Sequence, residues 1–384
     1  MPARIQVKSL PDRIAVHQHQ SNQNIKIFPR ACAAGAARAL LVMLLLGAAA
    51  CRNAVPASAR QPGPARFVLA FGSCALQTEP QPIWGPIAAS RPDIFLFLGD
   101  TVYADTASME VKRQAYATLA GIPGFRDLRK STPILAMWDD HDYGYNDVGG
   151  EYPEKIASQR LFLDFFQEPA DSPRRKRPGI YGSYYYGQAP RLIQVILLDT
   201  RYFRDSLELT VPRPSFKTAY KPTTDKNKTI LGSDQWEWLE KELGKPAQVR
   251  IIATGIQLVT DGHQGEKWGN FPHELARLYR LIERTGAEGA VVISGDRHYA
   301  EFSAEREGVP YPLYDFTSSS LNRGWAKGAR EPNRHRIGTA VPVPNFGLIT
   351  IDWKAGSIIA EIRGDDGRLL LSHTVDMGEL KIKK

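Results

Sequence analysis

The chain has 384 residues, of which 43% are hydrophobic, and a formal net charge of +8 at pH 7. This apolar content is enough for a large core, in one α/β domain or two smaller ones, and it excludes disorder for most of the chain. Residues 1–50 contain six Lys or Arg and one Asp, so +5 of the charge belongs to that segment and +3 to the rest, which argues against a dedicated nucleic-acid partner.

The first segment has the pattern of a bacterial export signal. A polar, basic lead ends at Arg38 and is followed by the apolar run ALLVMLLLGAAA and then by Cys51. An apolar run of about twelve residues between a basic lead and small residues is typical of a cleaved signal, and it is short for a membrane span. Residues 1–50 are therefore predicted to be an export signal, with the mature protein in the periplasm.

The sequence around Cys51 is compatible with two forms of the exported protein, one tethered to a membrane and one released. The stretch LGAAAC resembles a bacterial lipobox, in which the cysteine is lipidated and becomes the first mature residue, although Ala48 stands where leucine is usual. Ordinary cleavage nearby would release the protein, whereas lipidation would tether it, and membrane contact is expected only through such an anchor. Residues 51–65 are rich in Pro and Ala and are predicted to be a linker, followed by one domain over 66–376.

The first half of this domain alternates strands and helices. Apolar runs bounded by turn residues predict strands at 65–74, 93–100 and 133–140. Helical patterns lie between them and after them, at 81–90, at about 106–129 and at 153–166.

The second half of the domain ends in a β-rich tail. Its predicted elements are a strand pair at 179–187 and 191–201, a long loop from 203 to 230, a helix at 232–245 capped by Ser233, a strand at 249–256, a helix at 273–286, a strand at 289–296, and tail strands at 313–319, 346–353 and 357–364. Strands that occur both between helices and as terminal hairpins predict a four-layer α/β/β/α sandwich.

Three of the predicted strands end on a carboxylate. Asp100, Asp140 and Asp296 each stand where an apolar run stops, in DIFLFLGDTVYAD, PILAMWDDHDYGYND and AVVISGDRHY. One such aspartate is most often a turn or helix cap. Three of them, two with a nearby histidine, are instead typical of an α/β protein that gathers acidic ligands at the carboxyl edge of its sheet. A metal-dependent hydrolase is therefore the first hypothesis.

Other metal-binding residue types accompany these aspartates. Tyr103 lies three residues after the first of them, close enough for one turn to aim both at a single centre, and a phenolate suits a hard ion such as Fe³⁺. His141 and His298 follow the other two, and Cys74 closes the first strand with a thiol that could bind iron or zinc. For Cys74 a small buried apolar role is the alternative.

The same segments carry a resemblance. They resemble the calcineurin-like metallophosphoesterases, and more closely the alkaline phosphatase D (PhoD-like) family. The segments GSC, GDTVYAD, WDDHDYGYND, LLDTRYFRD, EKWGNFP and SGDRHY occur in that family's order, over roughly residues 66–355.

The resemblance implies a metal-binding role for six residues. Asp100 would bridge two metal ions. Tyr103, His298 and Cys74 would complete the protein ligands of the first ion, Fe³⁺. The remaining two, Asp140 and Asp296, would face a second and harder ion, Ca²⁺. They replace an Asn and a His that are usual in the wider superfamily, and oxygen ligands favour calcium over the alternatives, zinc or manganese.

The implied activity is the hydrolysis of a small phosphate ester. A hydroxide activated by two metal ions would attack a phosphomonoester, while His141 would stabilise the transition state or protonate the leaving oxygen, and Asn146 would touch phosphate or the second metal. A phosphodiesterase or phospholipase D-like esterase is the alternative, and a non-catalytic exported binding protein is a remote one. Asp199 and Arg201 are predicted to form a structural ion pair under the site, and His263, His273, His335 and His373 are predicted to be surface or structural residues.

Overall fold

The computed structural model describes residues 65–210 and 219–383. The predicted export signal, the lipidation candidate Cys51 and all of the predicted linker except its last residue lie outside the described residues. Within the described part, no helix is both long enough and apolar enough to cross a membrane.

The first sheet has six strands in the order β15-β14-β13-β1-β2-β3. Its strands are β1 (Arg66–Gly72), β2 (Ile94–Leu98), β3 (Ile134–Met137), β13 (Asn345–Asp352), β14 (Ser357–Gly364) and β15 (Leu369–Asp376). β1, β2 and β3 are parallel, and the last three strands return as an antiparallel meander against β1. Every residue of β2 is buried, as expected for a strand covered on both faces.

The second sheet has seven strands in the order β12-β10-β11-β9-β8-β5-β4. Its strands are β4 (Gly182–Tyr186), β5 (Ile193–Leu197), β8 (Val249–Thr254), β9 (Ala290–Ser294), β10 (Ala300–Glu305), β11 (Leu313–Ser318) and β12 (Arg336–Val341). A separate short pair is formed by β6 (Glu208–Leu209) and β7 (Tyr220–Lys221). The two large sheets share one core, where Phe67 of β1 contacts Tyr186 of β4 with ring centroids 5.2 Å apart.

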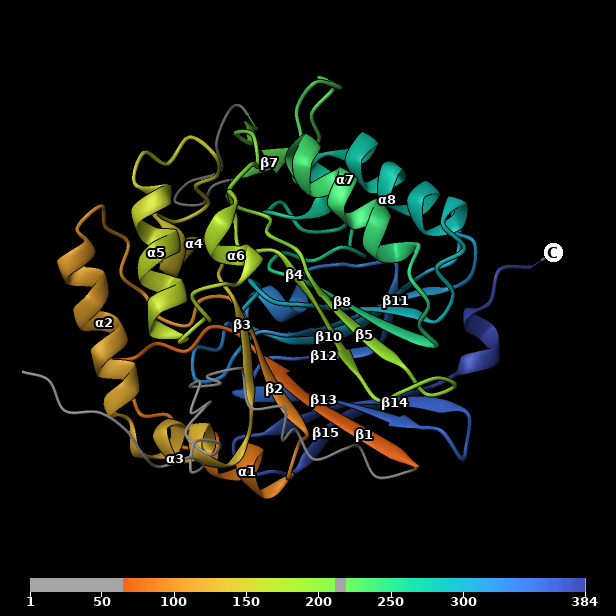
Figure 1. The fold of residues 1–384 in the computed structure, drawn as a ribbon, viewed down its shortest axis with the longest axis horizontal. Coiled ribbons are helices and arrows are strands. Elements are labelled where there is room, and N and C mark those ends of the chain that lie inside the picture. Colours follow the sequence, from red (N-terminus) through yellow and green to blue (C-terminus); the bar gives the residue numbers. More distant parts are fainter. Residues whose placement is uncertain (1–64, 211–218, 384) are drawn as a thin grey trace, which may run out of the picture. The chain divides into compact units, whose positions relative to one another are not determined.

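Helices cover the outer faces of both sheets (Figure 1). The α-helices are α1 (Trp84–Ala89), α2 (Met109–Gly121), α3 (Pro123–Ser131), α4 (Asp140–Tyr143), α5 (Lys155–Phe165), α6 (Pro173–Lys176), α7 (Gly232–Leu243) and α8 (Pro272–Arg284); 3₁₀ turns are at Trp268–Asn270, Gly328–Arg330 and Met377–Leu380. Trp84 of α1 packs on Phe95 and Phe97 of β2, whereas α7 and α8 lie side by side over the second sheet. The predicted α/β/β/α sandwich is confirmed.

The helix predicted at about 106–129 is in fact two helices. Ile122 separates α2 from α3 in an extended conformation with ψ of 117°. The reason is Pro123, whose ring disfavours helical geometry at the preceding residue and which has no N–H for an interior helix bond. The predicted cap of α7 is also wrong, because Leu231 occupies the N-cap position and the Ser233 hydroxyl contacts Asp234 instead.

Strands β10, β12 and β15 were absent from the sequence prediction, and so was the short pair β6 and β7, which lies in the segment predicted to be a long loop. In β10 the polar residues Glu301 and Ser303 alternate with the apolar ones and yet are buried. Glu301 is paired with Arg336 of β12 and accepts a hydrogen bond from Gln257. A strand whose polar residues are satisfied inside the fold lacks the apolar signal that sequence patterns detect.

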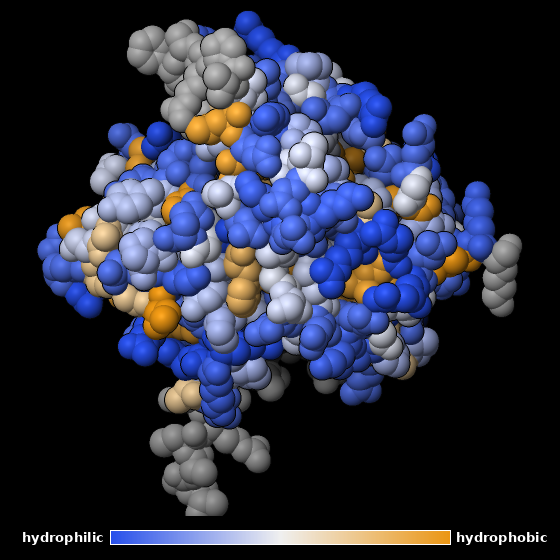
Figure 2. Space-filling model, turned by 90° about the horizontal axis from the view of Figure 1, so that it is seen from above, coloured by the Kyte–Doolittle hydropathy of each residue, from blue (hydrophilic) through white to orange (hydrophobic). Residues whose placement is uncertain are grey.

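The face of the molecule shown in Figure 2 is mostly hydrophilic, with hydrophobic residues scattered over it. Large exposed hydrophobic side chains of the described residues, such as Val111, Ile156 and Leu369, come from α2, α5 and β15. Single hydrophobic residues of this kind are normal on a protein surface.

Candidate metal centre

The candidate site is built from turns that follow parallel strands. Cys74 follows β1, Asp100 follows β2, and Asp296 and His298 follow β9. All four are non-glycine residues with positive φ, between 48° and 70°. Left-handed backbone is costly for such residues and persists where the surrounding structure imposes it, often at functional sites.

Gly99 shows why the turn after β2 has its sequence. Its φ is +106°, and a Cβ placed on it would lie 2.3 Å from the Cβ of Asp139. The turns after β2 and β3 therefore come together only because residue 99 has no side chain. Asp142 of α4 joins the same two turns, since its carboxylate accepts hydrogen bonds from the backbone N–H and the hydroxyl of Thr101.

Cys74, Asp100, Tyr103 and His298 form the first group of donor atoms. The Tyr103 hydroxyl lies 3.1 Å from Asp100 Oδ2 and 3.0 Å from His298 Nε2. Cys74 Sγ lies 3.4 Å from the same Oδ2. Ligand atoms of the cysteine, the aspartate and the histidine are all within 4.8 Å of one another, close enough to bind one ion.

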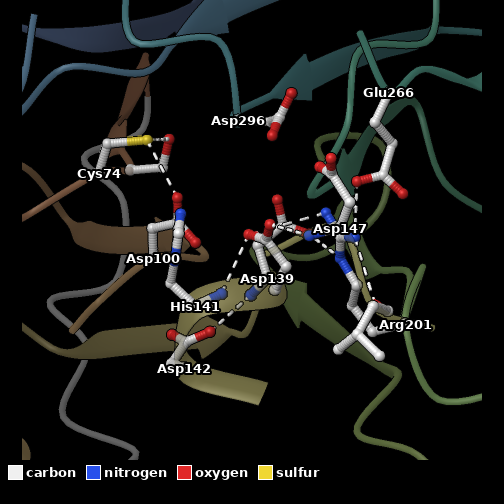
Figure 3. Close-up of polar contacts among 12 residues, drawn as sticks. Cys74, Asp100, Asp139, His141, Asp142, Asp147, Arg201, Glu266 and Asp296 are labelled. Atoms are coloured by element: carbon white, nitrogen blue, oxygen red, sulfur yellow. Dashed lines mark hydrogen bonds and ion pairs between the residues drawn. The ribbon is translucent and has the colours of Figure 1, made fainter. Parts of the chain in front are cut away.

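A second group consists of carboxylates and adjoins the first. Asp139, Asp140 and Asp296 place oxygen atoms within 4.8 Å of one another. Asp100 and Asp140 also approach His141 within that distance, so Asp100 belongs to groups on both sides. Figure 3 shows Asp100, Asp139, His141 and Asp296 gathered around one space. The two groups are therefore linked through Asp100 and Asp140, which is the arrangement expected of two neighbouring cation sites.

Burial and mutual repulsion make Asp100 and Asp296 poor anions without a cation. Burial raises the pKa of Asp100 well above its usual value, and the charges of Cys74 and Asp140 add to the effect. Burial likewise raises the pKa of Asp296, against the opposing charge of Arg297. Oδ1 of Asp100 and Oδ2 of Asp139 are buried and have no hydrogen-bond partner among the described residues. Such orphaned oxygens are expected where a cation completes the site.

The raised pKa values of the Cys74 thiol and the Tyr103 phenol also indicate that a cation completes the site. Burial raises the pKa of Cys74 to about 11, although hydrogen bonds with Ser319 and Ser73 oppose the increase. Burial also raises the pKa of Tyr103 well above its usual value, and the neighbouring Asp100 adds to this. Neither group would ionise in this environment unless a cation took the place of its proton. The donor set of thiolate, phenolate, imidazole and carboxylate therefore fits a hard, highly charged metal ion beside a second, oxygen-bound one.

Asp105 is a site residue that the sequence analysis did not identify. Both of its carboxylate oxygens lie 2.8 Å from Nδ1 of His141, and it too has a positive φ, of 41°. Burial disfavours a charged imidazole, but the carboxylates of Asp140, Asp100 and Asp105 outweigh burial and raise the pKa of His141 to about 11. The only sequence signal was that Asp105 closes the segment GDTVYAD.

A buried ion-pair network lies under the carboxylate group. Arg201 contacts Asp139 at 2.5 Å and Glu266 at 2.6 Å, and Arg204 contacts the same glutamate at 3.0 Å. The predicted pairing of Arg201 with Asp199 is therefore wrong. Asp199 instead accepts hydrogen bonds from backbone N–H groups and from the indole of Trp138.

The site opens into a cavity of about 770 Å³. Most of the predicted site residues line it: Asp100, Asp140, His141, Asn146, Asp296 and His298. Glu266, Asp147, Arg297, Trp325 and Glu331 also line it, and none of them was predicted as a site residue. His263 was predicted to be a surface or structural residue, but it too lines this cavity.

Comparisons with known proteins agree with this geometry. The sequence model of the PhoD-like phosphatase family matches residues 69–343. Alkaline phosphatase D of Bacillus subtilis (strain 168) is 22% identical, over 55% of this chain and 42% of its own, so the chain spans less than half the length of that relative.

Solved structures share the fold. A structure of PhoD has a TM-score of 0.66 at 17% identity, covering 84% of this chain and 73% of its own. GAP50, the anchor in the inner membrane complex of Plasmodium, has a TM-score of 0.54 at 14% identity, covering 83% of this chain and 90% of its own. At these identities the likeness concerns the fold alone.

Proposed function

Because the chain belongs to the PhoD-like phosphatase family, as predicted from its motifs, we propose that it is a metal-dependent hydrolase of phosphoric esters. The observation that carries the proposal is the pair of adjoining donor groups beside one cavity, which are linked because Asp100 of the first group and Asp140 of the second approach each other and His141. We assign Cys74, Asp100, Tyr103 and His298 to an Fe³⁺ ion, and Asp100, Asp140 and Asp296 to Ca²⁺; zinc or manganese is the alternative. The bound cations would activate a water molecule and neutralise phosphoryl charge.

His141 is the proton donor in this proposal. Its Nδ1 is held by Asp105, which fixes the ring and favours the imidazolium. The other ring nitrogen, Nε2, is then available to stabilise charge on the phosphoryl group or to protonate the leaving oxygen. The residue lines the cavity together with Asn146, to which we assign contact with phosphate or the second metal.

The proposed substrate is a phosphomonoester, and a phosphodiester is the alternative. A phosphodiester would also fit, because the cavity volume of about 770 Å³ is far larger than a phosphate group needs. A phosphodiesterase would use the same donor groups and require only room for a second ester arm. The protein is also proposed to be exported, as a periplasmic protein or as a lipoprotein tethered through Cys51, on the pattern of residues 1–51.

Metal analysis together with turnover tests this function. Purified protein should contain iron, show a visible phenolate-to-iron absorption band, and hydrolyse phenyl phosphate or bis-p-nitrophenyl phosphate in a calcium-dependent manner. The faster substrate distinguishes the two ester classes. Tyr103→Phe should abolish the band, whereas Tyr185→Phe, a matched change of a partly exposed tyrosine in β4, should leave it unchanged. Turnover with zinc or manganese and no band would overturn the metal assignment, and no turnover with any metal would overturn the function.

A further inference from the structure

Part of the cavity wall differs in chemistry from the metal-binding donor groups. It is formed by Gly262, His263, Gln264 and Gly265 from one loop, together with Arg297, Trp325 and Glu331. None of these residues belongs to the donor groups assigned to the metals. A phosphate ester held at the metal centre must direct the rest of its structure toward such a wall, since the acidic floor is occupied by ligands and cations.

The charged groups of this wall are already paired. Arg297 Nη2 lies 2.5 Å from Glu331, and Nη1 lies 3.8 Å from Asp296. The guanidinium is therefore paired with Glu331, and this ion pair presents little net charge to a ligand.

His263 is uncharged as well. Burial lowers its pKa well below the usual value, and the positive charges of Arg297 and Lys267 lower it further. Gln257 donates through its amide nitrogen to Glu301 and Thr317, so its oxygen accepts from Nε2–H of the histidine. Nδ1 therefore carries a lone pair, and among the described residues it has no hydrogen-bond partner.

The loop that contains His263 is held in place. The Lys267 ammonium contacts the carbonyl oxygens of His263 and Gly265. A Cβ on Gly262 would lie 1.7 Å from the carbonyl oxygen of Pro332, so this residue packs directly on the next segment. The wall is thus formed before any ligand arrives, which lowers the cost of binding.

Trp325 supplies the aromatic surface of the wall. Its backbone N–H donates to the carbonyl oxygen of His298 at 2.7 Å, which couples its position to the first donor group. The six-membered ring of the indole packs against Gly328, where a Cβ would lie 2.2 Å from Cε3. The Arg297 guanidinium lies 5.7 Å from the indole centroid. The indole is only partly buried and lines the cavity.

We propose that this wall is the subsite for the organic arm of the ester, that it takes an uncharged arm with a flat apolar face, and that Trp325 is its specificity-determining residue. The inference rests on the proposed function, because it deepens the description of the same site. Aromatic faces contribute area and a stacking preference that a small alkyl arm cannot exploit.

The test compares benzyl phosphate with ethyl phosphate, two esters of primary alcohols that differ in the arm. In the metal-loaded protein, Trp325→Leu should lower the benzyl-to-ethyl ratio of kcat/KM by about tenfold, as expected for loss of one aromatic contact. Trp325→Phe should retain most of the ratio. The matched control is Trp238→Leu, a partly buried tryptophan of α7 that packs on Tyr181, which should leave the ratio unchanged. An unchanged ratio in Trp325→Leu would overturn the proposal.

The charge of the arm provides an independent test. Wild-type protein should hydrolyse benzyl phosphate with a higher kcat/KM than 4-carboxybenzyl phosphate, because the only cation among the wall residues named above, Arg297, is paired with Glu331. Equal rates, or a preference for the carboxylate, would contradict an uncharged arm.

A binding measurement separates this inference from the proposed function. Benzylphosphonate and ethylphosphonate cannot be hydrolysed, and calorimetry with the metal-loaded protein reports their affinities without turnover. Tighter binding of benzylphosphonate that is lost in Trp325→Leu supports the subsite even if no ester is hydrolysed, in which case the proposed function alone fails. Equal affinities, or no binding of either, would overturn the subsite whatever the turnover.

Discussion

The contact between Asp105 and His141 can be tested by the substitution Asp105→Asn. Asparagine has nearly the same shape and tolerates the positive φ of 41° at this position. Its amide oxygen still accepts a hydrogen bond from Nδ1–H, so the substitution removes the charge and retains a neutral contact. Any effect on turnover then reports on the negative charge behind the imidazole.

The expected size follows from the geometry. Hydrogen bonds to charged groups contribute about 1.5–3 kcal/mol and neutral ones about 0.5–1.5 kcal/mol. The Asp105 side chain is 43% exposed, so solvent screens its charge and the lower end of the difference applies. A loss of about 1 kcal/mol in the transition state corresponds to a kcat roughly fivefold lower. KM should change little, because the contact acts through His141 and not on the bound ester.

The pH dependence of kcat should also change in Asp105→Asn, and the direction of this change can be predicted. The Asp105 carboxylate raises the pKa of His141, so its removal lowers that pKa. If the imidazolium is the active form, activity is lost as the pH rises through its pKa, and the alkaline limb of the kcat profile should move to lower pH in Asp105→Asn. Asp105→Asn should leave unchanged any limb of the kcat profile that reflects the titration of another group.

Steady-state kinetics across pH, with phenyl phosphate as substrate, would measure both effects. Asp127→Asn is a suitable control, because this exposed carboxylate pairs with Lys130 on α3, outside the cavity lining. In a His141→Ala background, Asp105→Asn should cause no further loss. A full fivefold loss in that background, or an unchanged kcat and profile in the single variant, would refute the proposed coupling.

Two further predictions concern stability. Arg201→Met should lower the free energy of unfolding by about 3–5 kcal/mol, because Asp139 would remain buried without its partner and Glu266 would lose one of its two arginines. For a domain of roughly 300 residues this corresponds to a melting temperature about 5–8 °C lower by calorimetry, and a change no larger than that of the exposed control Arg191→Met would contradict it. Burial lowers the pKa of Lys112 to about 8, so the folded state disfavours its charge. As the pH rises from about 8 to about 10.5, wild-type protein should therefore gain stability relative to Lys112→Met. Melting temperatures of the two proteins across this pH range test this, and equal pH slopes would show that the residue is not desolvated.

The fold and the first elements of the site were predictable because they depend on local patterns. The apolar run of β2 followed by Gly99 and Asp100 encodes a buried strand, a turn that needs glycine and a carboxylate at the sheet edge. The same logic located Asp140 and Asp296. Their order along the chain, with the motifs around them, was enough to identify the family.

Other predictions failed where a residue's environment depends on distant segments. Arg201 was assigned to Asp199 because the two are close in sequence, but its partners are Asp139 and Glu266, each more than sixty residues away. His263 was set aside because no motif surrounds it, and folding places it in the wall of the cavity.

The sequence by itself determined the layered architecture, the family and the strand-end residues Asp100, Asp140 and Asp296, because strand periodicity and turn chemistry are properties of short segments. Only the tertiary structure decided that Asp105 supports His141 and that Trp325 faces the same cavity. Side-chain partners depend on which loops meet at the sheet edge, and that meeting is fixed by the packing of the whole domain.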